Sequence, residues 1–470
     1  MDNIQMKEFY KEAENDLILL NCRFNGIEIY ILNNMVEYLE KSLAYGKIIR
    51  EELQMLDETF KELKDELTVE ESIEVQIKFK NYYNLINKQF ETNAVTNVIP
   101  SSMVVSLVSS FDYFIAKLIR LSYRYNTQII SAEKMNVSYQ EIGLLESIND
   151  VKNYCIDKIV DLQFRDSHKA LFDYIEKTFS IKGIKDISEY KNILLIAEMR
   201  NIIVHNDGFN NISFKNNIKS CGIKVDYNSF FDSDNKLKLI NRKYIEFVRN
   251  NLICFYVKLF YLFIYHFCRR DNTVIENLSS RINDLALEYY EKKDYDIALS
   301  LFDFMLNNCN TSSEKFMFTI NKCMCLKAQN KMEEVHSFLG DLDWSNCNHV
   351  YIFAKYLLLD DFDNVYEYIK KNPNGMEYNY QFWPLCKPLI QKPEFANLYR
   401  RLYGKEFQYK IRSGRMSKEE IKNIVQEINK IVDDSKLNKD TNSSENNPKS
   451  ASGEILREEK QDGSDDQSEN

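Results

Sequence analysis

The stretch Arg200-Asn201-Ile202-Ile203-Val204-His205-Asn206-Asp207-Gly208 ends a long segment, Ile187 to Val204, in which apolar residues recur at helical spacing. The glycine at its end is the residue that most readily adopts the left-handed conformation with which many helices stop. We therefore predict a core helix that carries a strong cation and a titratable imidazole in its last turns. The apolar residues at helical spacing in this segment are Ile187, Tyr190, Ile193, Leu194, Ala197 and Val204.

Composition extends the helical prediction to the whole chain. The 470 residues include only 12 glycines and 6 prolines, and four of those prolines fall between Pro373 and Pro393. Signals for β-hairpin turns are almost absent. The sequence therefore predicts an all-α fold, and its length predicts two or three domains.

We expect four segments along the chain. Residues 1–95 form an N-terminal helical arm, because Glu and Lys alternate with growing density after Ile48. Residues 96–270 form a helical bundle that begins near Pro100-Ser101-Ser102, a boundary followed by a plausible N-cap. Residues 271–432 form helical repeats, and residues 433–470 form a disordered acidic tail.

The predicted repeats are recognised by their turns. The spacing of apolar residues between Ile282 and Met305 resembles a tetratricopeptide repeat, in which paired antiparallel helices interlock. The signature Tyr295-Asp-Ile-Ala298 recurs in degenerate form at Met332 and Phe362, with offsets of 37 and 30 residues. The resemblance implies a helical-hairpin array that binds a protein partner, and a last helix is expected from Ser417 to Val432.

Charge and cysteine content exclude several function classes. The net charge is −10, of which the tail from Asp433 contributes −6 (11 acidic and 5 basic residues), so the remainder carries only −4. A protein that coats nucleic acid non-specifically would be basic. The ten cysteines show neither zinc-ligand spacing nor a disulfide framework, which predicts free thiols in a reducing cytoplasm and no metal site.

A membrane location is also not expected. The N-terminus has no secretory signal. The apolar run Leu252–Cys268 is short for a bilayer span and is interrupted by Lys258 and His266, so we predict a buried or interfacial helix there.

The chemistry of the opening stretch follows from helical geometry. Asn201 and His205 are four residues apart and share one face, and the long side chain of Arg200 can reach the same cleft. Asn206 and Gly208 form the helix C-cap. His205 lies in the last turn, where the helix dipole favours an imidazolium. Asp112, within the apolar helix after Pro100, is either a solvated residue or a polar group facing this cleft.

Arginine and histidine in this arrangement are suited to cleaving RNA without a metal. That reaction needs a base for the 2′-OH proton, an acid for the 5′-oxygen, and a cation for the crowded phosphorane. One histidine cannot serve as base and acid at once. The sequence contains five histidines, and none of the other four lies in a comparable setting, so two motif helices would have to meet in a dimer.

The motif resembles the signature of the HEPN superfamily of ribonucleases. It has an arginine followed directly by an asparagine, a histidine five residues after the arginine, and an Asn-Asp-Gly ending. The resemblance covers roughly residues 96–270. It implies a compact helical bundle that dimerises through the motif helix, with Arg200 and His205 catalytic and Asn201 supporting. It also implies a role for Asp112, because some members place an acidic or polar residue on the first bundle helix.

The resemblance implies a homodimeric endoribonuclease with an RNA substrate, a 2′,3′-cyclic phosphate product, and no metal or cofactor. Many members act in antiphage defence, abortive infection or toxin modules, and some are joined to sensor domains. Two alternatives stay open: a non-catalytic helical scaffold and an RNA- or nucleotide-binding regulator. In either case Arg200 would be a surface residue or a ligand contact, and His205 a helix-end histidine.

Overall fold

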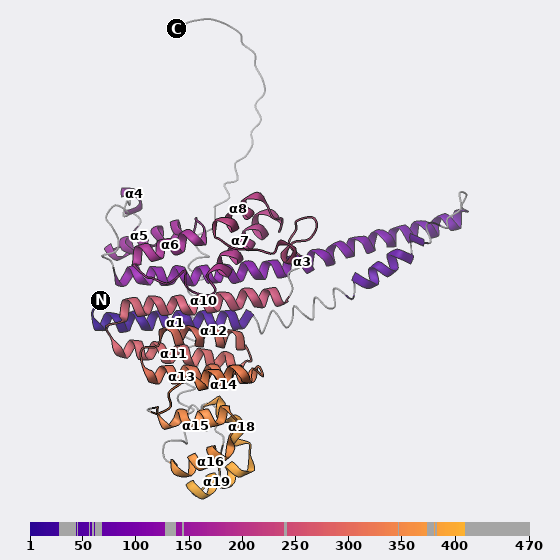
Figure 1. Ribbon diagram of the computed structural model, residues 1–470. Helices are drawn as coiled ribbons and strands as arrows, with labels where there is room; N and C mark the ends of the chain where they lie inside the picture. The colour runs from indigo at the N-terminus through magenta and orange to yellow at the C-terminus, as the bar shows by residue number, and fades with distance from the viewer. Residues whose placement is uncertain are drawn as a thin grey trace, which may run out of the picture. The chain divides into compact units, whose positions relative to one another are not determined.

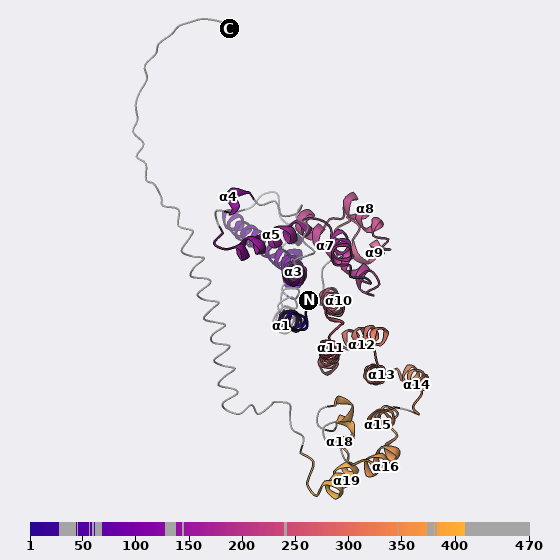
Figure 2. The same ribbon diagram turned by 90° about the vertical axis from the view of Figure 1, so that its left-hand side faces the viewer.

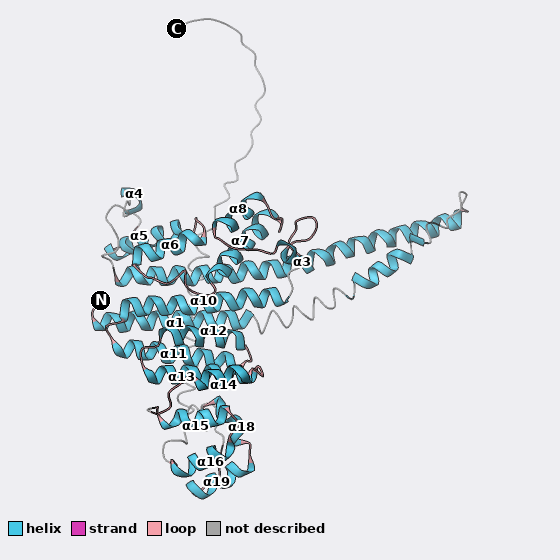
Figure 3. Cartoon of the chain, in the orientation of Figure 1, coloured by secondary structure: helices cyan, strands magenta, loops and turns pink. Residues whose placement is uncertain are grey.

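The structure is a computed structural model in which helices account for nearly all regular structure. It describes residues 1–27, 44, 46–55, 57–58, 61, 68–126, 138–142, 145–238, 242–345, 347–373, 380 and 383–408. Within these ranges there is no strand, and the only β-type pairings are isolated bridges between Phe209 and Lys236 and between Phe231 and Leu237 (Figure 3). The predicted all-α fold is confirmed.

Three long helices form the centre of the larger compact unit, which comprises residues 1–376 and 384–389. They are α1 (Asn3–Ile27), α3 (Val69–Tyr125) and α10 (Arg242–Cys268). The three helices lie side by side in Figure 1 and are seen end-on in Figure 2. Aromatic side chains join them: the ring centroids of Phe9 and Phe267 are 5.4 Å apart, and those of Phe111 and Phe255 are 6.0 Å apart. From Ile245 to Cys268 α10 is predominantly apolar, and most of this stretch is buried.

A second group of helices lies on α3. It consists of α4 (Tyr139–Ile142), α5 (Ile148–Gln163), α6 (His168–Phe179), the motif helix α7 (Tyr190–Asn206), α8 (Ile212–Ser220) and α9 (Tyr227–Phe230). Of these, α5 and α7 contact α3 directly, and α7 also contacts α10. The far face of α7 closes a small second core in which Met199 and Ile202 pack with Phe214 and Phe231. The motif helix is therefore fixed from two sides.

The predicted boundary at Pro100 is wrong, because α3 continues through the proline. Proline removes one backbone hydrogen bond and normally kinks or ends a helix. Here the residues that follow, Met103, Val104 and Leu107, are buried in the main core. Packing of this face compensates for the missing bond, so the helix that carries Asp112 begins at Val69 instead of after the proline.

Residues 272–371 form successive helix pairs. These are α11 (Asn272–Glu291) with α12 (Tyr295–Asn308), α13 (Ser312–Ala328) with α14 (Met332–Gly340), and α15 (His349–Leu358) with α16 (Phe362–Lys371). Tyr295, Met332 and Phe362, the positions of the predicted turn signature, each begin the second helix of a pair.

The turns inside the three pairs have the same geometry. Each contains a left-handed non-glycine residue: Lys293 (φ 67°), Asn330 (φ 61°) and Asp360 (φ 56°). In each turn the next residue donates its backbone N–H to the carbonyl five positions earlier, over 2.9, 3.0 and 2.9 Å. The chain therefore contains a structural repeat, while its membership of the tetratricopeptide class remains a prediction.

The sequence boundaries at residues 95 and 270 also remain predictions. The first falls inside α3 and the second follows the end of α10, and helices on both sides share the main core: α1 before the first, and α11 and α12 after the second. The smaller unit, residues 377–383 and 390–470, contains α19 (Pro393–Tyr403), whose Phe395 and Tyr399 pack on Tyr380. The short 3-10 helix η4 (Pro384–Cys386) belongs to the larger unit, as does α18 (Lys387–Ile390) except for its last residue. The helix expected at 417–432 and the acidic tail lie outside the described residues.

Two described helices, Val98–Tyr125 within α3 and α10, are long and apolar enough to cross a membrane by length and composition alone. In α10, 78% of the most apolar window is buried inside the protein, against 50% for the segment of α3. Core helices of soluble proteins have the same composition, and α10 is packed as one. The expected cytoplasmic location stays a prediction.

Candidate functional site

The motif helix ends where the sequence predicts, through a left-handed turn. Asp207 (φ 49°) and Gly208 (φ 80°) both have positive φ, and the Gly208 N–H donates to the Ile202 carbonyl over 2.9 Å. Such a pair of left-handed residues satisfies carbonyls that the last turn leaves free. His205 and Asn206 are thereby held in the final turn of α7.

The motif helix begins at Tyr190, with Glu189 as its N-cap. The Glu189 side chain makes no capping bond. Its carboxylate is used elsewhere: the buried Lys258 Nζ on α10 donates to Glu189 Oε1 and Oε2 over 2.8 and 2.7 Å. The same ammonium also donates to Ser188 Oγ over 2.8 Å and, across to α12, to Ser300 Oγ over 2.7 Å.

The cluster of Lys258, Glu189, Ser188 and Ser300 is an electrostatic anchor for α7. Burial by itself would raise the pKa of Glu189, but the Lys258 ammonium and the hydrogen bonds outweigh it, so the pKa is lowered. Glu189 is therefore a buried carboxylate held in its charged form. This anchor joins the motif helix to α10 and to the first helix pair.

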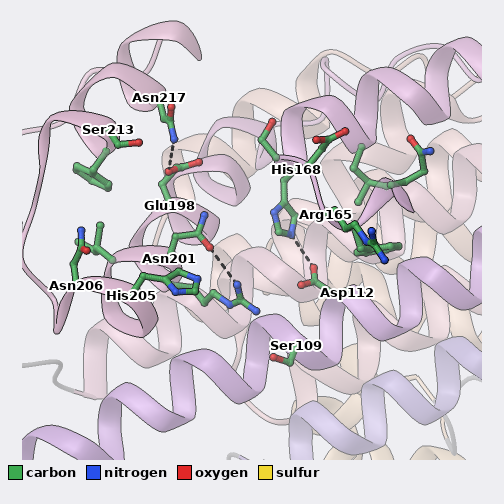
Figure 4. Close-up of a pocket in the computed structure, with 18 of the residues that line it drawn as sticks. Ser109, Asp112, Arg165, His168, Glu198, Asn201, His205, Asn206, Ser213 and Asn217 are labelled. Carbon is green, nitrogen blue, oxygen red and sulfur yellow. Dashed lines mark hydrogen bonds and ion pairs between the residues drawn. The ribbon is translucent and has the colours of Figure 1, made fainter. Parts of the chain in front are cut away.

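A cavity of about 840 Å³ opens beside the last turns of the motif helix (Figure 4). Five of the residues predicted from sequence line it: Arg200, Asn201, His205, Asn206 and Asp112. They come from α7 and α3, and the other walls come from the turn between α5 and α6 and from residues 211–217. Gly208 instead lines a different indentation, on the opposite side of the helix end.

Arg200 presents a cation that no described carboxylate neutralises. One guanidinium nitrogen, Nη1, donates to Asn201 Oδ1 over 3.2 Å, drawn as a dashed line in Figure 4. Its Nε is buried and has no acceptor among the described residues. A guanidinium with unused donors in a cavity is suited to an anion with several oxygens, such as a phosphate.

His205 is exposed at the mouth of the cavity, and its ring makes no hydrogen bond to a described residue. Figure 4 shows the ring next to Asn201. The residue is therefore free to exchange protons with a bound molecule or with water. Asn201, which accepts from Arg200, can hold the guanidinium in place beside it.

A second histidine lines the same cavity, contrary to the expectation from sequence. The His168 ring, at the first position of α6, lies with Nε2 2.7 Å from Asp112 Oδ1 (Figure 4). The two residues are 56 positions apart, and no spacing rule connects them. Two features of the sequence point toward this pair. Ser167 is a plausible N-cap just before His168, and Asp112 is the single aspartate in α3. Asp112 thus lines the cavity and is paired with His168 there.

The remaining lining residues give the cavity a mixed character. Glu198 is only 9% exposed, and its Oε2 accepts from Asn217 Nδ2 over 3.0 Å. Asp161 is paired with Arg120 over 2.9 Å. Arg165 makes no ion pair within the described ranges and supplies a second cation. The cavity therefore has polar and apolar walls, with two arginines that make no ion pair to a described residue and with most of its carboxylates already bound.

Metal-ligand and thiol chemistry find no support in the described residues. No group of three or more His, Cys, Asp or Glu side chains there could hold a metal ion. All ten cysteines are free, and burial raises the pKa of the thiols of Cys254 and Cys323 to about 12. Such thiols remain protonated at neutral pH and react poorly.

No family model, curated protein or solved structure matches this chain. The HEPN resemblance therefore rests on the residues of the motif alone. What the site can do follows from its own groups: an unpaired guanidinium, an exposed imidazole and an imidazole bound to a carboxylate, all lining one cavity.

Proposed function

We propose that this protein is a metal-independent endoribonuclease of the HEPN type. The observation that carries the proposal is the guanidinium of Arg200, which makes no ion pair with a described residue and lines a cavity with the exposed imidazole of His205. In this proposal Arg200 binds the non-bridging oxygens of the scissile phosphate and stabilises the charge of the phosphorane. His205 transfers a proton, and Asn201 holds Arg200 in position.

We further propose that the chain forms a homodimer through the motif helix. Three apolar side chains near the end of α7 favour this: Val204 is 47% exposed, Val98 59% and Phe209 42%. Val204 and Val98 line one shallow indentation of about 470 Å³ on the side of α7 away from the cavity. The biological setting that the resemblance suggests is antiphage defence or a toxin module, with the helix pairs at 272–371 binding a partner or trigger.

The test is cleavage of a labelled RNA by the purified full chain in the presence of EDTA. We expect a 2′,3′-cyclic phosphate at the new 3′ end. Arg200→Ala should lower the cleavage rate by about 100- to 1000-fold, the usual effect of removing one donor to a developing oxyanion. Expression of the wild type, and not of the variant, should arrest growth of the host cell.

Matched controls are available on the same chain. Arg270→Ala and His336→Ala remove exposed residues that do not line the cavity, and both should cleave RNA like the wild type. Equal cleavage by the wild type and Arg200→Ala would contradict the proposal. Binding of RNA without cleavage by either protein would favour the RNA-binding regulator, and cleavage that required added Mg²⁺ would contradict the metal-independent mechanism.

A further inference from the structure

We infer that His168, positioned by Asp112, is the general base of this site, so that one chain carries both proton-transfer groups of the reaction. The inference rests on the proposed ribonuclease function and deepens it. It replaces the expectation that two copies of His205 must meet in a dimer. Dimerisation then becomes a matter of assembly or control, and is not required to supply a second histidine.

His168 is held at the cavity wall by Asp112. Its Nε2 lies 2.7 Å from Asp112 Oδ1, and the two side chains are 16% and 21% exposed. The ring also packs near Phe172, with centroids 6.3 Å apart. The pair is therefore covered on one side and open on the side of the cavity, as a proton-transfer group requires.

Asp112 also selects the tautomer of His168. A carboxylate accepts a hydrogen bond, so Asp112 keeps the hydrogen of a neutral His168 on Nε2 and leaves the lone pair on Nδ1. The carboxylate also stabilises the imidazolium that forms when Nδ1 takes a proton, as the aspartate does in serine hydrolases. Asp112 is thus a positioning residue, and His168 is oriented to accept a proton.

His168, His205 and Arg200 line the same cavity. Figure 4 shows His168 standing between Asp112 and the side of the cavity that carries Asn201 and His205. Arg200 lines the same space and makes no ion pair with a described residue. A phosphate held by Arg200 would thus have an imidazole from α6 on one side and the imidazole of α7 on the other. If the His168–Asp112 pair served only to join α6 to α3, His168 would not need to line a cavity with a ring nitrogen, Nδ1, that makes no hydrogen bond to a described residue.

The reaction balances with these groups alone. His168 Nδ1 takes the 2′-OH proton, the 2′-oxygen forms a bond to phosphorus, and the bond from phosphorus to the 5′-oxygen breaks. His205, in its protonated form, donates its proton to the leaving 5′-oxygen. The products are a 2′,3′-cyclic phosphate and a 5′-hydroxyl, and no metal, oxidant or water is consumed.

The experiment compares two substrates with the purified full chain. On an RNA dinucleotide, His168→Ala and His205→Ala should each lower the rate by about 100- to 10,000-fold. On uridine 3′-(4-nitrophenyl phosphate), the leaving group needs no proton. His205→Ala should therefore recover to within about tenfold of the wild type on this substrate, whereas His168→Ala should stay as slow as before.

Chemical rescue separates a catalytic from a structural role. Imidazole in solution should restore cleavage by His168→Ala, because it can replace the lost base, and it should do nothing for Asp112→Ala. His168→Gln keeps a donor to Asp112 and should fold like the wild type, yet cleave as slowly as His168→Ala. The unfolding midpoint of each variant, measured by circular dichroism, checks the fold.

The outcomes distinguish this inference from the proposed function. If the wild type does not cleave RNA, both fall. If the wild type cleaves and Arg200→Ala does not, but His168→Ala or His168→Gln cleaves normally, only the inference is overturned. A recovery of His168→Ala on the nitrophenyl substrate would also overturn it, because the residue would then act as the acid.

Whether one chain is sufficient is tested by mixing. His168→Ala and His205→Ala, unfolded together and refolded as a mixture, should remain inactive if both histidines serve the same chain's cavity. Recovery of up to a quarter of the wild-type rate would show that His168 and His205 act across a dimer interface, and would overturn the single-chain site.

Discussion

Replacing Lys258 with methionine tests how the motif helix is anchored. The Lys258 side chain is 2% exposed, and its ammonium donates to both oxygens of Glu189 and to the hydroxyls of Ser188 and Ser300. Methionine fills a similar volume but leaves the Glu189 carboxylate buried without a cation. Breaking a buried pair in this way costs about 3–5 kcal/mol, a large part of a total stability that is typically about 5–15 kcal/mol.

The decrease in the free energy of unfolding caused by Lys258→Met should depend on pH, and the direction of this dependence follows from the pKa of Glu189. The pKa of Glu189 is lowered from the ordinary value of 4.5, so its charged form stabilises the wild type at neutral pH. This contribution is lost as the pH falls through the folded-state pKa. In Lys258→Met, burial without the ammonium raises the pKa of Glu189 instead, which penalises folding at neutral pH. The difference between the two proteins should therefore be largest at pH 7 and shrink below pH 4.5.

The assay is urea unfolding followed by circular dichroism at several pH values. Lys258→Met/Glu189→Leu removes both charges and should recover most of the stability lost by Lys258→Met. The matched control is Lys370→Met, which breaks an exposed pair with Glu367 and should leave the unfolding midpoint unchanged. A loss below about 1 kcal/mol for Lys258→Met, or no recovery in the double variant, would refute the anchor.

Three further predictions follow from particular residues. Gly208→Ala should destabilise the protein by about 1–2 kcal/mol in urea unfolding, because alanine is strained at the φ of +80° that this position has. Crowding does not contribute, since Leu237 leaves ordinary space for a methyl group. Asp271→Ala should lower the free energy of unfolding by about 1 kcal/mol in the same measurement, because the Asp271 side chain accepts hydrogen bonds from two backbone N–H groups at the start of α11. An unchanged free energy of unfolding would contradict a stabilising N-cap at this position. Native protein treated with iodoacetamide at pH 7.5 should be modified at the exposed Cys22 and not at Cys254, whose pKa burial raises to about 12; mass spectrometry locates the label.

Much of the local structure was predictable because it depends on neighbouring residues. The turn signatures at Tyr295, Met332 and Phe362 mark real helix starts, since a short turn between two helices is specified by the few residues within it. The end of the motif helix at Gly208 was predictable for the same reason. Its start was not, because the side chain of Glu189 pairs with a lysine on another helix in place of capping its own.

For the candidate site, the residues on one helix were predictable and their partners were not. Helical periodicity alone places Arg200, Asn201 and His205 near one another, and they line one cavity. Asp112 could be singled out in an apolar run, but the sequence contains no information on what it faces. The contact between His168 and Asp112 could not be predicted, because the two residues lie 56 positions apart and no spacing rule connects them.

Interactions between residues a few positions apart specify the helical class, the turns of the repeated pairs and the end of the motif helix, which is why these features could be predicted. Packing between distant segments specifies the rest: α3 continues through Pro100, Lys258 is buried against Glu189, and His168 contacts Asp112 in the cavity that Arg200 and His205 also line. Burial of apolar faces brings distant helices together, and the polar groups carried with them must then find partners that local spacing does not specify.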